Sequence, residues 1–383
     1  MGFFAKSSSY SNTDSKPKIW IHAVSVGEVL AISSFVKALS KDYEIIISTI
    51  TDTGQRVAFE RFKNYPVKII YLPFDTPCAI RRTINFFKPK ALILVETELW
   101  PNLIFFSSKK FPVFIVNGRL SEKSYKGYKK LKIFIKPLLR KIHSIYVQEE
   151  TYKDRFINLG AEKERIYTTG NMKFDIEIKE ITFEWENSIP KPIILAGSTH
   201  EPEEEIITDI FIKLNINGTL IITPRHPERF ERVENVIKNK ITLSQREIYF
   251  SKLSEIKTSL NIKPSTMILL VDRMGILSSL YRMCDIAIIG GSFIPHGGQN
   301  PLEPAYWKKS FICGPHMNNF PFIEEFIKEQ ACIMTEKELL DKRILELINN
   351  NSLRNSIGLK AYEIFKKKSG ATERTLNHLK AIL

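Results

Sequence analysis

The residues that suggest chemistry lie in short polar segments that directly follow apolar runs. Glu28 comes shortly after the run 19–24, Glu96 follows the run 91–95, and Asn117 closes a third such run. A carboxylate in this position can act as a general base if it is partly desolvated and can reach an acceptor hydroxyl. Either glutamate could instead cap a helix. The sequence leaves both roles open for Glu28.

The most distinctive stretch is 290–305, which contains two glycine pairs and follows another apolar run. Glycine lets the backbone come close to a ligand without interference from a Cβ atom. A helix is predicted directly afterwards, with Asn300 as its N-cap and its first turn formed by Pro301, Leu302 and Glu303. A strand, a glycine-rich loop and a helix start together favour a phosphate. The alternative is a turn that only reverses the chain.

Other segments of the second half suit a nucleotide. Pro224 and Arg225 follow an apolar run, and a guanidinium there suits a phosphate oxygen, although a surface ion pair with Glu228 is the alternative. The backbone around Met274 and Gly275 could meet a base or ribose. The carboxylate of Glu303 could hold ribose hydroxyls, or only stabilise its own helix.

Several kinds of enzyme receive no support from the sequence. No HExxH, GxSxG, Walker A or Asp-x-Asp pattern occurs, which argues against metalloproteases, serine hydrolases, P-loop enzymes and metal-dependent sugar transfer. The 4 cysteines form no CxxC pair, so neither a zinc site nor a disulfide framework is expected. We therefore expect no metal and no cofactor.

The elements that carry these residues alternate between short apolar strands and amphipathic helices. This alternation predicts an α/β protein with parallel sheets and helices on both faces, in which ligands lie at the carboxyl ends of the strands. The pattern runs through the first half, pauses, and restarts near residue 192, so we expect two doubly wound, Rossmann-like domains facing a cleft. Strands are predicted at 19–24, 44–49, 67–72, 91–95, 111–116, 144–147, 192–196, 219–223, 266–271, 285–289 and 310–313.

The predicted domain boundaries follow from composition. Residues 1–18 are a polar N-terminal segment, 19–175 a first domain, 176–191 an acidic linker, and 192–383 a second domain closed by the C-terminal helices.

The charge of the chain predicts an anionic partner. Its formal net charge is +14 and its pI about 9.4. The most basic segment, 119–141, also contains an apolar stripe at helical spacing and Pro137, which is expected to bend it. A solvated helix face is the plain interpretation, and an anionic membrane surface or substrate is the alternative. The basic residues of this segment are Arg119, Lys123, Lys126, Lys129, Lys130, Lys132, Lys136, Arg140 and Lys141.

Taken together, these motifs resemble the Kdo transferases (3-deoxy-D-manno-octulosonic acid transferases, glycosyltransferase family 30) of Gram-negative lipopolysaccharide biosynthesis. The resemblance runs in order along the chain from about residue 19 to the C-terminus. The matching segments are 22–28, 71–75, 96–102, 117–121, 170–175, 198–201, 224–229, 274–275 and 297–303.

The resemblance implies a GT-B glycosyltransferase that transfers Kdo from CMP-Kdo to a lipid A precursor, with inversion and without a metal. It also implies that the domain 19–175 binds the acceptor and that the domain 192–383 binds the CMP-sugar. Glu28 matches the general base of the family, and Glu96 and Lys173 match positions that stabilise the transition state. The family's CMP-binding segments match Pro224, Arg225, Met274, Gly275, Ile276, Asn300, Pro301, Leu302 and Glu303.

Two departures from the family pattern matter. Ile276 stands where the family commonly has Glu, so only a backbone contact carries over at that position. The family usually begins with a hydrophobic anchor, whereas residues 1–4 resemble the end of the basic linker that follows it, and no run of eighteen apolar residues occurs. The implied location is the cytoplasmic face of the inner membrane, held there by the basic segment or by residues that precede this sequence.

Two rival functions are weighed. The nearest is a GT-B transferase or epimerase that uses a nucleoside diphosphate sugar. The other is a basic nucleic-acid-binding protein, which the absence of ribonucleoprotein motifs argues against. We therefore expect CMP-Kdo, a lipid A precursor and an anionic membrane surface as partners, and no nucleic acid.

Overall fold

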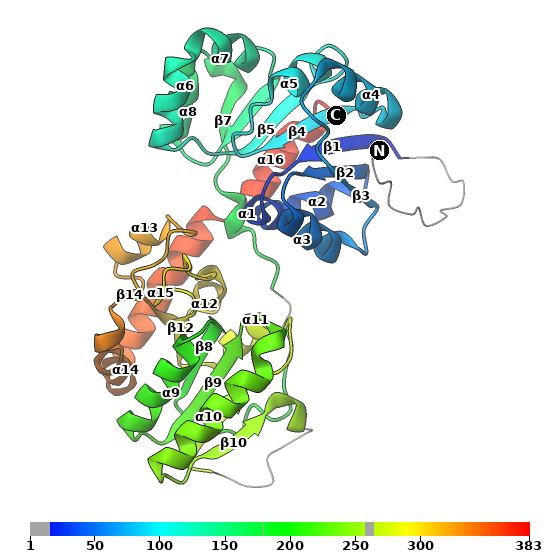
Figure 1. Ribbon diagram of the computed structural model, residues 1–383. Coiled ribbons are helices and arrows are strands. Elements are labelled where there is room, and N and C mark those ends of the chain that lie inside the picture. The colour runs from blue at the N-terminus through cyan, green and yellow to red at the C-terminus, as the bar shows by residue number, and fades with distance from the viewer. Residues whose placement is uncertain (1–15, 179, 257–263) are drawn as a thin grey trace. The chain divides into compact units, whose positions relative to one another are not determined.

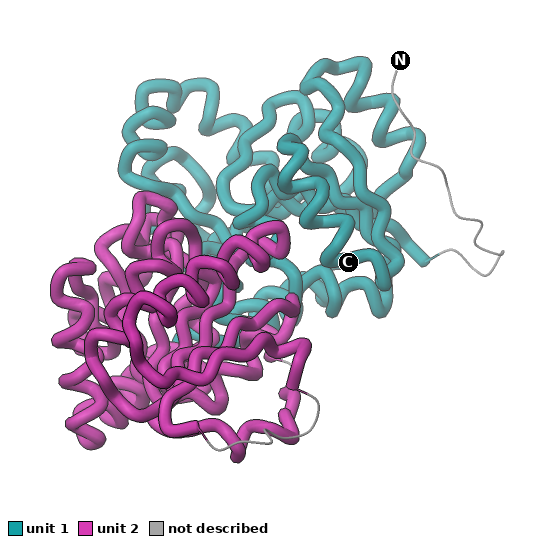
Figure 2. Tube along the Cα trace, turned by 60° about the horizontal axis from the view of Figure 1, so that its bottom comes forward, with its two compact units in different colours: residues 1–175, 368–383 teal, residues 176–367 magenta. Residues whose placement is uncertain are grey.

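The computed structural model describes residues 16–178, 180–256 and 264–383, so most of the predicted segment 1–18 lies outside the described residues. The described chain forms two compact units, shown in Figure 2. The first comprises the residues up to Asp175 together with Lys368–Leu383, and the second comprises Ile176–Lys367. Each unit is a parallel β-sheet covered by helices, as predicted.

The first unit is built on a seven-stranded sheet of order β3-β2-β1-β4-β5-β6-β7, in which all strands are parallel. Its central strands are apolar because both faces are covered. Along β1, Ile19 and Ile21 belong to the core on one face, and Trp20 between them belongs to the core on the other. The strands are β1 (Lys18–His22), β2 (Glu44–Thr49), β3 (Val67–Tyr71), β4 (Ala91–Val95), β5 (Val113–Gly118), β6 (Ser144–Val147) and β7 (Ile166–Thr168).

The helices of the first unit cover both faces of this sheet. Helices α1, α2, α3 and α16 contribute to the core that contains Ile19, and α4, α5, α7 and α8 contribute to the core that contains Trp20. The helices are α1 (Val26–Ala31), α2 (Ser33–Leu39), α3 (Asp52–Phe62), α4 (Pro77–Phe87), α5 (Pro101–Ser107), α6 (Glu122–Lys130), α7 (Lys132–Leu139), α8 (Glu150–Leu159) and α16 (Ala371–Lys380).

The second unit has a seven-stranded parallel sheet of order β10-β11-β9-β8-β12-β13-β14. Its strands are β8 (Ile193–Thr199), β9 (Gly218–Pro224), β10 (Tyr249–Lys252), β11 (Thr266–Leu270), β12 (Ile286–Ile289), β13 (Ser310–Cys313) and β14 (Ile333–Met334). Its helices are α9 (Glu203–Leu214), α10 (Phe230–Ser244), α11 (Leu277–Met283), α12 (Leu302–Tyr306), α13 (Ile323–Lys328), α14 (Leu340–Asn349) and α15 (Asn351–Lys368).

The C-terminal helix corrects the predicted domain boundary. The sequence placed residues 368–383 with the second domain, but α16 packs on the first unit, where its red ribbon lies among the blue and cyan elements in Figure 1. The side chain of Asp175 caps this helix, because Oδ1 accepts from the N–H of Gly370 at 2.6 Å and Oδ2 from that of Thr372 at 2.5 Å. The predicted linker 176–191 belongs to the second unit, with Trp185 buried.

The basic segment 119–141 also differs from its prediction. It forms two helices, α6 and α7, and the break falls at Leu131, whereas Pro137 lies inside α7. Helix α6 has no buried residue, and Ile133 and Phe134 on α7 are 85% and 72% exposed. Among the described residues, no helix combines the length and apolar character needed to cross a membrane.

Candidate active site

Each of the two sheets has one point at which its strand order reverses. In the first sheet this point lies between β1 and β4, and in the second between β8 and β12. Doubly wound sheets bind ligands at this place, beyond the carboxyl ends of the strands, because the loops on either side turn away from each other there. Glu28 follows β1 and Glu96 follows β4, so both flank the reversal point of the first unit.

Glu28 lies in the first turn of α1, whose N-cap is Ser25. Its Oε2 accepts a hydrogen bond from the backbone N–H of Val24 at 2.8 Å, and its Oε1 accepts one from the Ser25 hydroxyl at 2.9 Å. The Ser25 hydroxyl in turn lies 3.4 Å from the backbone N–H of Glu28. Ser25 therefore caps the helix, and the Glu28 carboxylate stabilises the helix start by accepting from the N–H of Val24 and the hydroxyl of Ser25, not from the N–H of Ser25 as in a capping box.

The environment of Glu28 also suits a base. The residue is only 7% exposed. Its pKa is raised to about 7, mainly by burial and also by the negative charges of Glu96 and Glu98, while the Val24 and Ser25 hydrogen bonds oppose this shift. A carboxyl group with a pKa near 7 is divided between its acid and base forms at neutral pH, which is the condition under which a general base is most effective.

The loop after β4 brings two more carboxyl groups close to Glu28. Glu96 has φ of +57°, a left-handed conformation that is uncommon for a residue with a side chain. Glu98 accepts a hydrogen bond from the Trp100 indole at 3.2 Å, and burial raises its pKa. The packing around Glu96 has to offset the cost of this backbone conformation. Residues in such conformations concentrate at functional sites.

His22, at the end of β1, is a buried residue that the sequence did not assign. Its Nδ1 lies 3.1 Å from the carbonyl oxygen and 2.9 Å from the hydroxyl oxygen of Ser48. Its Nε2 has no hydrogen-bond partner among the described residues, and burial lowers its pKa to about 4. The ring packs edge-on against Trp100, with centroids 6.1 Å apart. His22 is therefore a neutral, buried side chain at the end of β1, one of the two strands between which the strand order reverses.

Lys173 lies in the short 3-10 turn η2 (Met172–Phe174), far from Glu28 in sequence but in the same unit. The side chain of Asn117, at the end of β5, fixes this turn by accepting a hydrogen bond from the N–H of Met172 at 3.0 Å. Lys173 is half-buried, and within the described ranges its ammonium group makes no ion pair or hydrogen bond with another residue. The turn also contacts α1, which carries Glu28.

The two arginines of the segment after β9 have different roles. Arg229 forms a bidentate ion pair with the buried Glu204, with N–O distances of 2.7 and 3.1 Å. Arg225 has no ion-pair partner in the described part of the chain, and its predicted alternative partner, Glu228, instead lies 3.8 Å from His226. Arg229 is therefore structural, and Arg225 keeps its charge available to a ligand.

A buried carboxylate that the sequence analysis missed holds the glycine-rich loop. Glu203, at the start of α9, is 1% exposed and accepts backbone N–H bonds from Gly291 at 2.6 Å, His200 at 3.0 Å and Phe293 at 3.1 Å. Burial keeps its pKa above the ordinary value despite these donors. The only signal in the sequence was an acidic helix start, which is usually a capping feature.

Protein packing accounts for the glycines themselves. A Cβ atom at Gly290 would collide with the carbonyl of Ser198, and one at Gly298, whose φ is +77°, would collide with Met317. The loop therefore needs these glycines to fit against its own neighbours, as in the turn interpretation left open by the sequence. An anion at this loop would therefore be held by the side chains around it.

Those side chains form a histidine cluster. The ring of His200 lies 4.1 Å from that of His296 and 5.5 Å from that of His226, measured between centroids. Its Nε2 lies 3.0 Å from Nε2 of Gln299. The pKa of His200 is lowered to about 4, mainly by burial and also by the nearby His296, His226, Arg229 and Arg225. A site in which imidazole and guanidinium groups gather around one histidine favours an anion.

The remaining predicted residues lie beside this cluster in the sequence. Helix α12 begins at Leu302, one residue later than predicted, and Oδ1 of Asn300 accepts the N–H of Leu302 at 3.0 Å. The helix has only 5 residues, so its dipole is small. Glu303 lies in its first turn, near the amide of Asn300 at 3.4 Å.

The segment around Gly275 presents its backbone and turns one side chain inward. Met274 is 48% exposed, while Ile276 is 5% exposed. A backbone contact at Ile276 stays a prediction. Within the described ranges, no group of three or more His, Cys, Asp or Glu side chains is arranged to hold a metal ion.

Comparisons with known proteins agree with the predicted family. Residues 1–176 match the family model described as 3-Deoxy-D-manno-octulosonic-acid transferase (kdotransferase). The chain is 36% identical to the 3-deoxy-D-manno-octulosonic acid transferase of Haemophilus influenzae, over 98% of this chain and 90% of that protein. It is 38% identical to a bifunctional glycosyltransferase/methyltransferase of Fusobacterium nucleatum over 91% of this chain, which spans 57% of that longer protein.

The fold also has solved relatives. A putative UDP-N-acetylglucosamine 2-epimerase from Listeria monocytogenes matches with a TM-score of 0.57 and 14% identity, covering 96% of both chains. At that identity, the likeness concerns the fold alone. Together with the two parallel sheets, it confirms the predicted α/β architecture of two Rossmann-like units of the GT-B type.

Proposed function

Because this chain belongs to the family of 3-deoxy-D-manno-octulosonic acid transferases, which are glycosyltransferases of lipopolysaccharide biosynthesis, we propose that it transfers Kdo from CMP-Kdo to a lipid A precursor. The observation that carries the proposal is Glu28, a buried carboxyl group with a pKa of about 7 at the reversal point of the first sheet. The second unit binds the donor, and the first supplies the base.

In the proposed reaction, the Glu28 carboxylate takes the proton of the acceptor hydroxyl. The acceptor oxygen forms a bond to the anomeric carbon of Kdo from the side opposite the phosphate. The bond between that carbon and the phosphate oxygen breaks, and CMP leaves with the electron pair. The configuration at the anomeric carbon is therefore inverted.

The charges that develop in this step have partners among the predicted residues. Negative charge grows on the CMP phosphate, and the unpaired guanidinium of Arg225 suits it. Positive charge grows at the anomeric carbon, and the carboxylate of Glu96 suits that. Lys173, held by the Asn117–Met172 hydrogen bond, supplies a second cation for the negative charges of the donor. In this proposal these side chains stabilise the developing charges, and the reaction needs neither a metal nor a cofactor.

The rest of the donor site follows from the segments around the histidine cluster. Pro224, Met274, Gly275 and the backbone of Ile276 would line the nucleotide. Asn300, Pro301, Leu302 and Glu303 would face its ribose and phosphate. Support for this assignment comes from the exposure of Met274 and the available backbone at Gly275, where a Cβ atom would meet nothing within 4 Å.

We also propose that the protein works at the cytoplasmic face of the inner membrane, with helices α6 and α7 against the anionic bilayer. Leu131, Ile133 and Phe134 are 54%, 85% and 72% exposed, and the charged residues beside them in the sequence are lysines. Apolar side chains flanked by basic ones suit the headgroup region of an anionic membrane. The 4 free cysteines agree with a reducing compartment.

The experiment that tests the transferase compares wild type, Glu28→Gln and a control variant, Glu122→Gln on the exposed helix α6. Each is incubated with CMP-Kdo and tetraacyl lipid A precursor, and the product masses are measured. We expect Kdo mass increments with wild type and Glu122→Gln, and a loss of orders of magnitude with Glu28→Gln. Equal turnover in all three proteins would remove Glu28 from the base role.

A second measurement tests the donor. A ligand that binds the native state raises the melting temperature. CMP is therefore expected to raise it more than UDP does at equal concentration. A larger effect of UDP would favour a transferase or epimerase that uses a nucleoside diphosphate sugar.

A further inference from the structure

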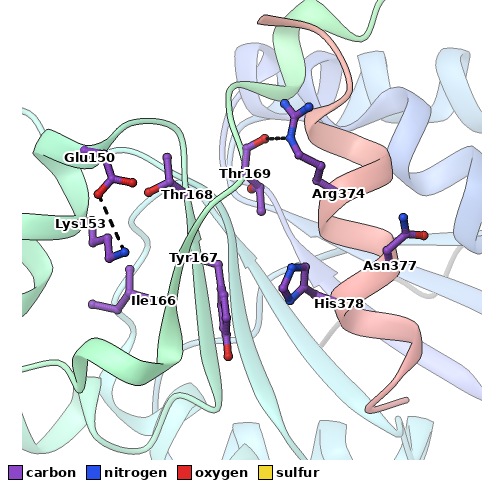
Figure 3. A pocket seen from close by; sticks show the side chains of 9 residues that line it. All are labelled: Glu150, Lys153, Ile166, Tyr167, Thr168, Thr169, Arg374, Asn377 and His378. Atoms are coloured by element: carbon purple, nitrogen blue, oxygen red, sulfur yellow. Dashed lines mark hydrogen bonds and ion pairs between the residues drawn. The ribbon is translucent and has the colours of Figure 1, made fainter.

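A pocket in the first unit lies apart from the candidate active site. Its volume is about 360 Å³, and its walls come from α8, from β7 with the residue after it, and from α16 (Figure 3). Strand β7 is the edge of the sheet, four strand spacings from β1, which is on the order of 19 Å. The lining residues are Glu150, Lys153, Ile166, Tyr167, Thr168, Thr169, Arg374, Asn377 and His378.

The charges of this pocket favour an anion. Arg374 donates from Nε to the carbonyl of Thr169 at 2.9 Å and from Nη1 to that of Ser369 at 3.1 Å, both neutral acceptors. In the described part of the chain, no carboxylate lies within ion-pair distance of its guanidinium group. Lys153 lies 3.8 Å from Glu150, whose side chain is 69% exposed, so this pair is weak. The lining therefore holds two cations and one solvated acid.

The other walls offer ring faces and neutral polar groups. Tyr167 and His378 face each other in Figure 3, with ring centroids 4.7 Å apart. The ring of Tyr146 stacks on Tyr167 from the core side, with centroids 5.6 Å apart and an interplanar angle of 23°. Aromatic rings with polar edges pack against the C–H face of a pyranose, and the hydroxyl of Thr168 and the amide of Asn377 suit its hydroxyls.

We propose that this pocket binds a monosaccharide-sized anionic sugar, carrying a carboxylate or a phosphate, at a site separate from the transferase centre. The volume lies at the small end of the range for ligand pockets, which fits one sugar ring. Lys153 and Arg374 pair with the acidic group, and Tyr167 and His378 contact the ring. The sugar could be free or could be the headgroup of a glycolipid.

The pocket is also connected to the segment that carries Lys173. Arg374 holds the carbonyl of Thr169, and the Thr375 hydroxyl lies 3.0 Å from that of Thr169. At the other end, the start of α16 donates to Asp175. Helix α16 thus fixes both ends of the segment 169–175. A ligand on Arg374 therefore acts on a residue that positions this segment.

The test is calorimetric titration of the full chain with glucuronate and with glucose 6-phosphate, and with glucose as the neutral control. No nucleotide is present, so the outcome does not depend on sugar transfer. We expect saturable binding of both anions, with glucose at least tenfold weaker. Lys153→Gln and Asn377→Leu, both at accessible positions, should each weaken binding about fivefold to tenfold.

Two control variants locate the binding. Lys126→Gln removes an exposed lysine of α6, and Arg225→Ala removes the unpaired arginine of the second unit; both should bind the anionic sugars as wild type does. The proposal is overturned if wild type shows no saturable binding, if glucose binds equally well, or if Arg225→Ala rather than Lys153→Gln loses binding.

A competition experiment distinguishes the two sources of the sugar. Tetraacyl lipid A precursor in detergent micelles is added to protein loaded with glucose 6-phosphate. Displacement that disappears in Lys153→Gln assigns the pocket to a glycolipid headgroup. Retention of glucose 6-phosphate assigns it to a free anionic sugar, and displacement that is the same in Lys153→Gln and wild type contradicts the site.

Discussion

The hydroxyl of Ser25, the N-cap of α1, donates a hydrogen bond to Oε1 of Glu28 at 2.9 Å, so the proposed catalytic base is part of the helix start. A place in the helix start is compatible with catalysis because it holds the carboxylate in one orientation. The second oxygen is held by the N–H of Val24 at 2.8 Å. Capping and catalysis were alternatives in the sequence, and the structure allows both.

The first prediction concerns pH. Because burial and the charges of Glu96 and Glu98 raise the pKa of Glu28 to about 7, the base form is lost as the pH falls below that value. We expect kcat/KM to fall about tenfold per pH unit below pH 7. In Glu98→Gln, one of the neighbouring negative charges is gone, so the midpoint should move to lower pH. An acid limb with its midpoint near 4.5 in wild type would contradict a perturbed base.

The second prediction concerns the stability cost of this carboxylate. The raised pKa means that the folded state holds the proton more tightly than the unfolded state does, so stability falls as the pH rises from about 4.5 through 7. Glu28→Gln has no such loss. We expect its free energy of unfolding to exceed that of wild type by about 1 to 3 kcal/mol at pH 8, with a smaller difference at pH 5.

Urea unfolding at both pH values measures this difference. Glu122→Gln, at an exposed position of α6, is the matched control and should show almost no change with pH. If Glu28→Gln is equally or less stable than wild type at pH 8, burial of the charged carboxylate does not destabilise the folded state.

The third prediction separates the two arginines after β9. Arg229→Ala leaves the carboxylate of Glu204, which is 2% exposed, without its bidentate partner, so it should lower the free energy of unfolding by about 3 kcal/mol. Arg225→Ala removes no ion pair and should change stability by less than about 0.5 kcal/mol, but weaken CMP binding tenfold or more. Thermal unfolding and CMP titration check both. Unchanged CMP affinity in Arg225→Ala would remove this residue from the donor site.

The fourth prediction concerns the return of the chain to the first unit. Asp175→Ala removes the carboxylate that caps α16 and should lower the free energy of unfolding by about 1 to 2 kcal/mol. It should also lower kcat, because the segment 169–175 carries Lys173, while leaving CMP affinity unchanged. The control is Asp42→Ala, which breaks the exposed ion pair with Lys380 on the same helix and should cost at most a few tenths of a kcal/mol. Equal effects of the two substitutions would argue against the cap.

The fifth prediction concerns the membrane surface. Ile133→Ser combined with Phe134→Ser should reduce binding to vesicles that contain anionic phospholipid at least tenfold, since both side chains are largely exposed. Leu243→Ser, at an 80% exposed position of the second unit, is the control and should bind normally. Vesicle sedimentation at low and high salt measures this. Binding that is insensitive to both salt and the double substitution would place the membrane contact elsewhere.

The sequence determined the repeating strands well, because an apolar run buried on both faces is a local signal. The predicted strands 44–49, 91–95, 144–147 and 310–313 coincide with β2, β4, β6 and β13. The three strands that were missed, β7, β10 and β14, are edge strands of 2 to 4 residues. An edge strand is covered on fewer sides and needs no apolar run, so its pairing leaves little trace in the pattern.

The sequence also determined which polar residues follow the strand ends, because strand ends and polar turns follow from the same pattern, whereas the strand order that makes two of these ends neighbours at a reversal point came from the structure. Only the tertiary structure decided that Arg225 is unpaired while Arg229 is bound to Glu204, and that Glu203 holds the glycine-rich loop through three N–H groups. It also decided that the start of α16 meets Asp175: the N–H of Gly370 donates to this carboxylate, which lies 195 residues earlier in the chain. Apolar periodicity reports burial, which is a property of a local segment. Hydrogen bonds and ion pairs between distant segments depend on how those segments are brought together, which only the folded chain fixes.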